Sequence, residues 1–279
     1  MIPTAFEYAV PGSLDEAIRM LSEGGEDAKA LAGGHSLLPL MKLRLAAPSL
    51  LVDLRNVPGL EGITRDNGSV KIGALTRHVT LQSSDLGLPA TAAKQIADQQ
   101  VRNRGTIGGS IAHGDPASDL PTVLLAMDGA VIAHGPNGHR VIPAAQFFQD
   151  YLTTALAPDE LITEIALPDM GGYGHSYLKF ARRAEDWAMV GVAAMVDSGD
   201  TFDDVRVAFT HMGSVPLRAT QVEQALVGQP RDKASIAAAA ELAAEGTDPP
   251  GDLNATPDYK RHLARVLTRR ALEQAAGLS

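Results

Sequence analysis

The sequence predicts an α+β protein made of two consecutive units, and three observations support this prediction. Short apolar runs alternate with helical stretches through residues 1–172. Residues 168–174 (PDMGGYG) then form a turn-rich stretch with few core residues, which makes them the best candidate for a boundary between the units. Beyond this stretch, three strand candidates are followed by three helix candidates, an order typical of an α+β module.

The N-terminal segment is expected to contain a helix, a strand, a helical turn and a second strand. Ser13 and Glu16 have the spacing of a capping box, and apolar residues follow them at helical intervals. Pro39 is expected to interrupt the helical turn, because proline lacks a backbone N–H. In order, the expected elements are a helix at 13–24, a strand at 28–32, a helical turn at 36–45 and a strand at 50–54.

The later elements follow from the same helix and strand periodicities. Residues 102–121 stand apart, because this stretch is rich in Gly, Asp, Ser and Pro although apolar elements flank it. Before the boundary, the expected elements are a strand at 70–74, helices near 76–83 and 90–101, a hairpin of strands at 130–134 and 140–142, and a strand at 161–167. After it, the expected elements are strands at 177–181, 190–196 and 205–209 and helices at 219–227, 233–244 and 258–276.

Composition excludes several classes of function. The 279 residues include no cysteine, which rules out disulfides, cysteine nucleophiles and any iron–sulfur cluster held by this chain. With 24 Lys and Arg against 33 Asp and Glu the net charge is −9, so binding to nucleic acid through clustered positive charge is not expected. No apolar run approaches the roughly 18 residues of a membrane span, and residues 1–20 lack a secretory signal pattern. A cytoplasmic protein is therefore expected.

Two glycine-centred segments are the best candidates for a binding site. The first comprises Ala32, Gly33, Gly34, His35, Ser36 and Leu37, and the second comprises Thr106, Ile107, Gly108, Gly109 and Ser110. Without Cβ atoms, the glycine pairs allow backbone N–H groups to approach an anion such as pyrophosphate, and the neighbouring hydroxyls add donors. Neither segment matches the Rossmann fingerprint or the P-loop. One such pair alone is more simply a tight turn, but two favour a large phosphate-containing ligand.

Four stretches of the chain together resemble one protein family. They are AGGHSLLPLMKLRLAAPSLLVDL, VRNRGTIGGSIAHGDPASDLPTVLLAMDGAVI, KFARRAEDWAMVGVAA and the C-terminal run PDYKRHLARVLTRRALEQA. These resemble the FAD-binding medium subunit of molybdenum hydroxylases, a group that includes the carbon monoxide dehydrogenase medium chain and the flavin domain of xanthine dehydrogenase. The resemblance covers essentially the whole chain.

The resemblance implies a fold and a domain division. Residues 1–172 are expected to form an FAD-binding domain of the vanillyl-alcohol-oxidase (PCMH) type, with α+β lobes at roughly 1–55 and 56–172. Residues 173–279 are expected to form the C-terminal α+β domain of the carbon monoxide dehydrogenase flavoprotein type, in which a three-stranded antiparallel sheet is joined by helices.

The resemblance also implies FAD as the cofactor and a set of residues around it. The pyrophosphate and ribityl chain are expected along the two glycine segments. The family's ribityl-binding aspartate falls on Asp119, its strand residue near the flavin on or beside Ile162, and its lysine near the isoalloxazine ring on Lys179. Trp187 lies in a stretch that can approach the flavin.

Each of these assignments has a simpler structural interpretation. Asp119 can cap the helix that follows it, as Asp often does. Lys179 can be a solvated surface charge, and Trp187, the single tryptophan, can be a core anchor. His35 and His113 can donate to phosphate, and nothing in the sequence requires covalent flavin attachment. The histidines show no metal-ligand spacing such as H-E-x-x-H, and no residue is singled out as catalytic.

The lack of cysteine, taken with the resemblance, implies one subunit of a split enzyme. Its partners would be a small 2Fe-2S subunit and a large molybdopterin subunit, in a dimer of heterotrimers, and its FAD would pass electrons from the 2Fe-2S subunit to an external acceptor. Two alternatives stay open: a self-sufficient flavin oxidoreductase acting on its own small substrate, and a cofactor-free assembly scaffold. The sequence does not identify the substrate of the complex or the terminal acceptor.

Overall fold

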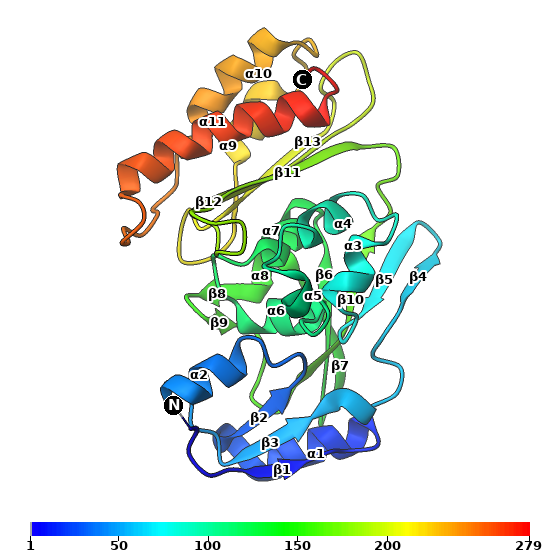
Figure 1. Ribbon diagram of the computed structural model, residues 1–279. Helices are drawn as coiled ribbons and strands as arrows, with labels where there is room; N and C mark the ends of the chain where they lie inside the picture. The colour runs from blue at the N-terminus through cyan, green and yellow to red at the C-terminus, as the bar shows by residue number, and fades with distance from the viewer. Residues whose placement is uncertain (1) are drawn as a thin grey trace.

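The computed structural model describes residues 2–279 and has three parts along its length (Figure 1). The N-terminal lobe, residues 2–57, holds a three-stranded sheet, the central part, residues 58–173, a five-stranded sheet, and the C-terminal part, residues 174–279, a four-stranded sheet. In Figure 1 the N-terminal lobe lies at the bottom and the C-terminal part at the top. This arrangement confirms the predicted α+β class with a small antiparallel sheet near the C-terminus, but that sheet has four strands and not three, because the two-residue strand Leu217–Arg218 joins it.

The N-terminal lobe is a parallel sheet of strand order β1-β3-β2. Its elements are β1 (Glu7–Ala9), α1 (Leu14–Gly24), η1 (Gly25–Asp27), β2 (Ala28–Leu31), α2 (Leu37–Leu43), β3 (Leu50–Asp53) and η2 (Leu54–Asn56). Helix α1 begins as predicted, because the Ser13 hydroxyl accepts a hydrogen bond from the N–H of Glu16 at 3.2 Å. The Glu16 carboxylate in turn accepts one from the N–H of Gly12 at 2.7 Å. The buried face of α1 packs with β2 and β3 in one cluster, which fixes where the chain after β2 enters the cavity described below.

The central part is an antiparallel sheet of order β4-β5-β10-β6-β7 with short helices on one side. Its strands are β4 (Ile63–Asp66), β5 (Ser69–Gly73), β6 (Ala130–Gly135), β7 (Gly138–Pro143), β10 (Leu161–Pro168) and the small pair β8 (Phe148–Asp150) and β9 (Thr153–Thr154). Its helices are α3 (His78–Gln82), α4 (Leu88–Ala93), α5 (Gln99–Arg102), α6 (Ile107–His113), α7 (Asp119–Ala126) and α8 (Ala144–Phe147). Every residue of α7 is buried, because this helix lies in the core that the central and C-terminal sheets share.

The C-terminal part is an antiparallel sheet of order β11-β12-β13-β14 covered by helices. Its elements are β11 (Gly174–Phe180), β12 (Val190–Val196), β13 (Val205–Thr210), β14 (Leu217–Arg218), α9 (Thr220–Leu226), α10 (Lys233–Ala240), η3 (Glu241–Ala244) and α11 (Pro257–Ala275). All seven residues of β12 are buried, because Ala193 and Met195 face the core around α7 while Val192 and Ala194 face the helices. A strand buried on both faces has a continuous apolar sequence, which explains why the run VGVAAMV indicates a strand.

Several expected elements differ in the structure. The helix expected at 90–101 is two short helices, α4 and α5, separated by a turn in which Ala97 has a positive φ of 40°. Much of the Gly- and Asp-rich stretch at 102–121 is helical, because α6 and the start of α7 lie in it. Pro39 does not interrupt α2, since it occupies the first turn, where a missing N–H costs no helical hydrogen bond. Strands β1, β4, β8, β9 and β14 were not predicted, and each has only two to four residues.

Candidate functional site

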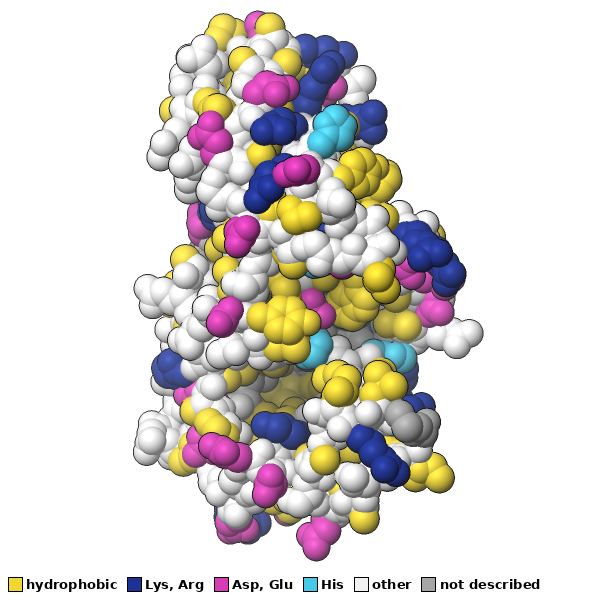
Figure 2. Space-filling model, turned by 90° about the vertical axis from the view of Figure 1, so that its left-hand side faces the viewer, with side chains coloured by type: hydrophobic (Ala, Val, Ile, Leu, Met, Phe, Trp, Pro, Cys, Tyr) yellow, Lys and Arg dark blue, Asp and Glu magenta, His cyan; other side chains and the backbone are white. Residues whose placement is uncertain are grey.

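A cavity of about 720 Å³ opens between the three parts of the molecule. Figure 2 shows the hollow between the N-terminal lobe and the central part. The volume lies in the range of cofactor sites. All the residues predicted for the site line this cavity except Ile107, which is buried in the core around α7. Residues that are far apart in the sequence therefore meet at one site.

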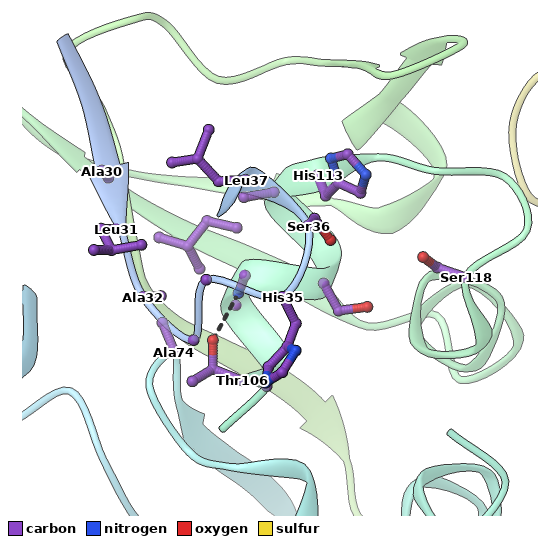
Figure 3. Close-up of a pocket in the computed structure, with 18 of the residues that line it drawn as sticks. Ala30, Leu31, Ala32, His35, Ser36, Leu37, Ala74, Thr106, His113 and Ser118 are labelled. Carbon is purple, nitrogen blue, oxygen red and sulfur yellow. Dashed lines mark hydrogen bonds between the residues drawn. The ribbon is translucent and has the colours of Figure 1, made fainter. Parts of the chain in front are cut away.

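The first glycine segment forms one wall of the cavity and offers free donors. The backbone N–H groups of residues 33–37 donate to no acceptor within residues 2–279. Gly34 has a φ of +77°, and consecutive N–H groups around such a left-handed residue form a concave nest that binds anions. In Figure 3 the chain turns sharply between Ala32 and Ser36, so these groups lie at the cavity. This set of donors suits a pyrophosphate.

The second glycine segment is built differently from the prediction. It is the first turn of α6, and its glycine N–H groups already have partners: Gly108 donates to the carbonyl of Ala74 at 2.8 Å, and Gly109 donates to the Thr106 hydroxyl at 3.2 Å (Figure 3). A Cβ at Gly108 would lie 2.6 Å from the Cβ of Ala74. The hypothesis that this pair presents free N–H groups to an anion is therefore wrong. The Ser110 hydroxyl lines the cavity without an acceptor or donor partner among residues 2–279.

Close packing of the two segments explains another glycine. A Cβ at Gly33 would collide with the backbone carbonyl of Arg104 and would lie 2.8 Å from the Cα of Gly105. The absence of a side chain at Gly33 therefore lets the N-terminal lobe touch the chain just before α6. This contact places the free N–H groups of residues 33–37 beside the N-terminus of α6.

A buried ion pair lies at another wall of the cavity. The Asp119 carboxylate accepts a hydrogen bond from Tyr177 Oη at 2.7 Å and pairs with Lys179 Nζ at 3.0 Å. Tyr177 and Lys179 point to the same face of β11 because side chains alternate along a strand. Lys179 is 5% exposed, so its interpretation as a solvated surface charge is wrong. Asp119 is the first residue of α7, with its side chain directed to β11, so the helix-cap interpretation is also wrong.

Burial dominates the electrostatics of this cluster. Burial raises the pKa of Asp119 above its ordinary value, although Lys179 and Tyr177 both favour the ionised carboxylate. Burial and the neighbouring carboxylate together raise the pKa of Tyr177 well above its ordinary value, so Tyr177 stays a neutral donor. Because each charge is paired, the cluster is a rigid element of the cavity wall that can present polar atoms to a ligand.

Two further predicted residues occupy distinct places. Ile162 is 6% exposed and lies on β10 beside a register shift between Ile162 and Glu164, the kind of bulge that often re-aims side chains near binding sites. Trp187 is 55% exposed at the cavity edge, so its interpretation as a core anchor is wrong. The cavity therefore has an apolar wall at Ile162 and an exposed aromatic side chain at its rim.

Three other parts of the cavity wall have no recognisable signal in the sequence. Residues 152–154 and 156–158, a segment that includes β9 and has no recognisable motif, line it. Ser118 lines it with a hydroxyl that has no hydrogen-bond partner among residues 2–279 (Figure 3). His78 also lines it, at 5% exposure, and burial, with smaller effects of His35 and Arg102, lowers its pKa to about 4. No cluster of three or more metal-ligating side chains occurs in the described chain.

Comparison with known proteins identifies the family. The model for the FAD binding domain in molybdopterin dehydrogenase matches residues 4–170. The chain belongs to the FAD-binding medium subunits of molybdenum hydroxylases. The model for the CO dehydrogenase flavoprotein C-terminal domain matches residues 175–275, so both parts of this medium subunit match the family. It is an oxidoreductase component whose cofactor is FAD.

Individual relatives agree over the whole length of this medium subunit. It is 43% identical to the carbon monoxide dehydrogenase medium chain of Hydrogenophaga pseudoflava, over 99% of this chain and 98% of that protein. It is 39% identical to the 6-hydroxypseudooxynicotine dehydrogenase complex subunit alpha of Paenarthrobacter nicotinovorans, over 99% and 96% of the two chains. A solved structure of the Hydrogenophaga pseudoflava carbon monoxide dehydrogenase matches with a TM-score of 0.96 and 44% identity, covering 100% of this chain and 99% of that chain.

The residues present fit FAD on structural grounds. Free N–H groups at residues 33–37 suit its pyrophosphate, and the unpaired hydroxyls of Ser36, Ser110 and Ser118 suit a polar chain. The cavity volume and its mixed polar and apolar walls suit a ligand with both phosphates and aromatic rings.

Within residues 2–279, the helices are too short or too polar to cross a bilayer.

Proposed function

We propose that this medium subunit carries electrons within a heteromeric molybdenum hydroxylase, from a small 2Fe-2S subunit to an external acceptor. When bound, FAD supplies the ability to carry two electrons and to exchange them one at a time. The chain has no cysteine with which to hold an iron–sulfur cluster, so that centre must belong to another chain. The relatives are named as a medium chain and as a subunit of a complex, which supports separate small and large partners.

The observation that carries this proposal is the cavity itself, whose walls come from all three parts of the molecule. We assign the pyrophosphate to the N–H groups of residues 33–37, the ribityl chain to the neighbourhood of Asp119 and the isoalloxazine ring to the space between Ile162, Lys179 and Trp187. We assign the FAD domain to residues 1–172 and the second domain to 173–279. Cytoplasmic location and a dimer of heterotrimers stay predictions.

The alternative of a self-sufficient oxidoreductase has less support. Lys179 and Asp119 are paired with each other, and Glu160 is paired with Arg140 at 2.7 Å. His78 lines the cavity, but only 5% of it is exposed. None of these three sites therefore offers a free, exposed base for oxidation of a separate substrate. The two relatives' names refer to different substrates, which agrees with substrate choice residing in another subunit.

The first experiment is an absorption spectrum of the purified chain before and after incubation with FAD and desalting, followed by co-expression with small and large subunits of a relative's complex. We expect retained flavin and co-purification of all three chains. We also expect the reducing substrate of that complex to bleach the flavin only when the small subunit is present. Bleaching of the isolated chain's flavin by the substrate would instead establish the self-sufficient oxidoreductase. Retained flavin that is never reduced in the assembled complex would refute the electron-transfer role.

A further inference from the structure

The connection between β11 and β12, residues 181–189, forms the rim of the cavity on the C-terminal side. Glu185, Asp186 and Trp187 line the cavity, and Ala188 behind them is buried. The connection has two backbone hydrogen bonds of its own, Asp186 N–H to Arg183 and Met189 N–H to Phe180. Within residues 2–279, the only side chain hydrogen-bonded to this connection is His211, whose Nδ1 lies 2.7 Å from the carbonyl oxygen of Ala188.

His211 is held in an unusual backbone conformation. It directly follows β13 and has a φ of +63°, in the left-handed region that few residues other than glycine adopt. Its backbone N–H donates to the carbonyl of Pro116, in the connection between α6 and α7, at 2.8 Å. Such a conformation persists only where the surrounding structure fixes it. His211 therefore ties the rim at Ala188 to the connection that precedes Asp119.

A buried cation lies on the other side of the imidazole ring. The Lys260 side chain, in the first turn of α11, is fully buried, and its Nζ donates to Asp252 at 2.7 Å and lies 3.5 Å from His211 Nε2. Burial works against ionisation of Asp252, but the hydrogen bonds from Lys260 and from two backbone N–H groups outweigh it and lower the pKa of this carboxyl. The Lys260–Asp252 pair therefore keeps a positive charge beside Nε2.

The two neighbours of His211 dictate which of its nitrogens carries the proton. The Ala188 carbonyl can only accept, so the Nδ1 facing it must be the protonated nitrogen. The ammonium of Lys260 disfavours a proton on Nε2, which stays bare. Burial lowers the pKa of His211 below its ordinary value, and the charge of Lys260 acts in the same direction. The Ala188 carbonyl and the nearby Asp252 and Asp115 oppose this shift without reversing it. The ring is therefore neutral, with the one tautomer that can hold Ala188.

We propose that His211 is a positioning residue that fixes the Glu185–Trp187 rim of the FAD cavity, with its tautomer set by Lys260 and Asp252. Through this contact the C-terminal part of the chain controls the order of the rim above the cofactor. The proposal goes beyond the electron-transfer function and rests on the cavity wall alone, so it holds or fails without any partner subunit.

The test uses the purified full-length chain without FAD, in which Trp187 is the single tryptophan and reports directly on the rim. His211→Gly accepts the positive φ and removes only the side chain. In this variant we expect lower fluorescence anisotropy of Trp187 and stronger quenching of its fluorescence by acrylamide. In a separate titration with FAD, we expect a Kd about fivefold higher than that of the parent, the equivalent of one lost neutral hydrogen bond. His211→Asn tolerates the same φ and keeps an N–H donor, so we expect it to restore values near those of the parent.

Two further variants separate positioning from stability. Val222→Ala removes buried methyl groups from the same C-terminal core, away from the rim, and should lower stability without changing the Trp187 signals. In the parent, long-range ¹H–¹⁵N NMR should show His211 in the Nδ1–H form, and in Lys260→Met it should show a departure from that form. Unchanged Trp187 anisotropy and quenching in His211→Gly would overturn the proposal. Equal changes in Val222→Ala, or no rescue by His211→Asn, would also overturn it.

Discussion

The two glycine pairs that line the cavity have the same sequence, but their backbone N–H groups differ in whether they are bonded within the chain. At Gly33 and Gly34, which line the cavity, the backbone N–H groups have no acceptor within residues 2–279, whereas at Gly108 and Gly109 both N–H groups are bonded within the chain. The first pair therefore presents donors, although Gly33 also makes room for Arg104. In the second pair, Gly108 makes room for Ala74 and presents no donor. A glycine pair in a sequence indicates a place with no room for side chains. Whether a ligand or another part of the protein occupies the space beside the glycines depends on the residues that pack around them.

The first pair should affect binding more than stability. Replacing Gly34 with Val forces a β-branched residue to a φ of +77° and places its Cβ 2.9 Å from Leu38, which must turn the N–H groups away from the cavity. Losing two charge-assisted hydrogen bonds to a pyrophosphate should raise the FAD Kd about 100-fold or more. Titration of the chain with FAD, followed by flavin fluorescence, measures this change.

The matched control for this variant is Gly59→Val. Gly59 has nearly the same φ, +80°, but an added Cβ would meet nothing within 4 Å and the residue does not line the cavity. We expect similar backbone strain with unchanged FAD affinity. If Gly34→Val binds FAD as Gly59→Val does, the free N–H groups of residues 33–37 do not hold the pyrophosphate.

The second pair should affect stability more than binding. A Cβ at Gly108 would lie 2.6 Å from the Cβ of Ala74 and 2.7 Å from its carbonyl oxygen, both in a packed core. Gly108→Val should therefore lower the free energy of unfolding by about 2–3 kcal/mol, the upper range for overpacking. Urea denaturation measures this loss of unfolding free energy. The control is Gly172→Val, where an added Cβ meets nothing within 4 Å, and we expect its stability to change little. A Gly108→Val chain that keeps its stability but loses FAD would reverse the comparison.

The contrast between the pairs also shows what the sequence could and could not predict. The apolar run of β12 and the capping box of α1 depend only on neighbouring residues, and the structure confirms both predictions. The N–H groups of Ile107 and Gly108 donate to the carbonyls of Thr76 and Ala74, about thirty residues away in the sequence. No local pattern therefore reveals whether these N–H groups are free or bonded. The same reason hides His211, whose partners Ala188 and Lys260 lie on other elements.

Asp119 and Lys179 illustrate an intermediate case. Each was singled out by family resemblance, and the structure shows that they bond to each other. The sequence separates them by sixty positions and places them on a helix and a strand, so their pairing required the packing of α7 against the C-terminal sheet. Family resemblance therefore indicates which residues belong to the site, whereas only the folded structure shows their hydrogen-bond partners and their burial.

The smallest expected effect is a pH dependence of stability that arises at the junction between the two glycine segments. His78 packs there, with its backbone N–H bonded to the carbonyl of Gly105 at 2.9 Å, and burial, then His35 and Arg102, lower its pKa from 6.5 to about 4. As the pH falls below 6.5, the unfolded chain binds a proton at this histidine that the folded chain does not bind. The associated stability is therefore complete above pH 6.5 and is lost progressively until the pH reaches about 4.

Between pH 7 and pH 5 this linkage should cost about 2 kcal/mol of unfolding free energy. His78→Leu removes the titrating group at the buried site, so its pH-dependent loss should be smaller than that of the parent by this amount. Urea denaturation at the two pH values measures the difference, and His139→Leu, at an exposed position of β7, should behave like the parent. If His78→Leu and the parent lose the same stability, His78 is protonated in the folded chain. The junction would then be more open to solvent than the close packing around Gly33 and Gly105 implies.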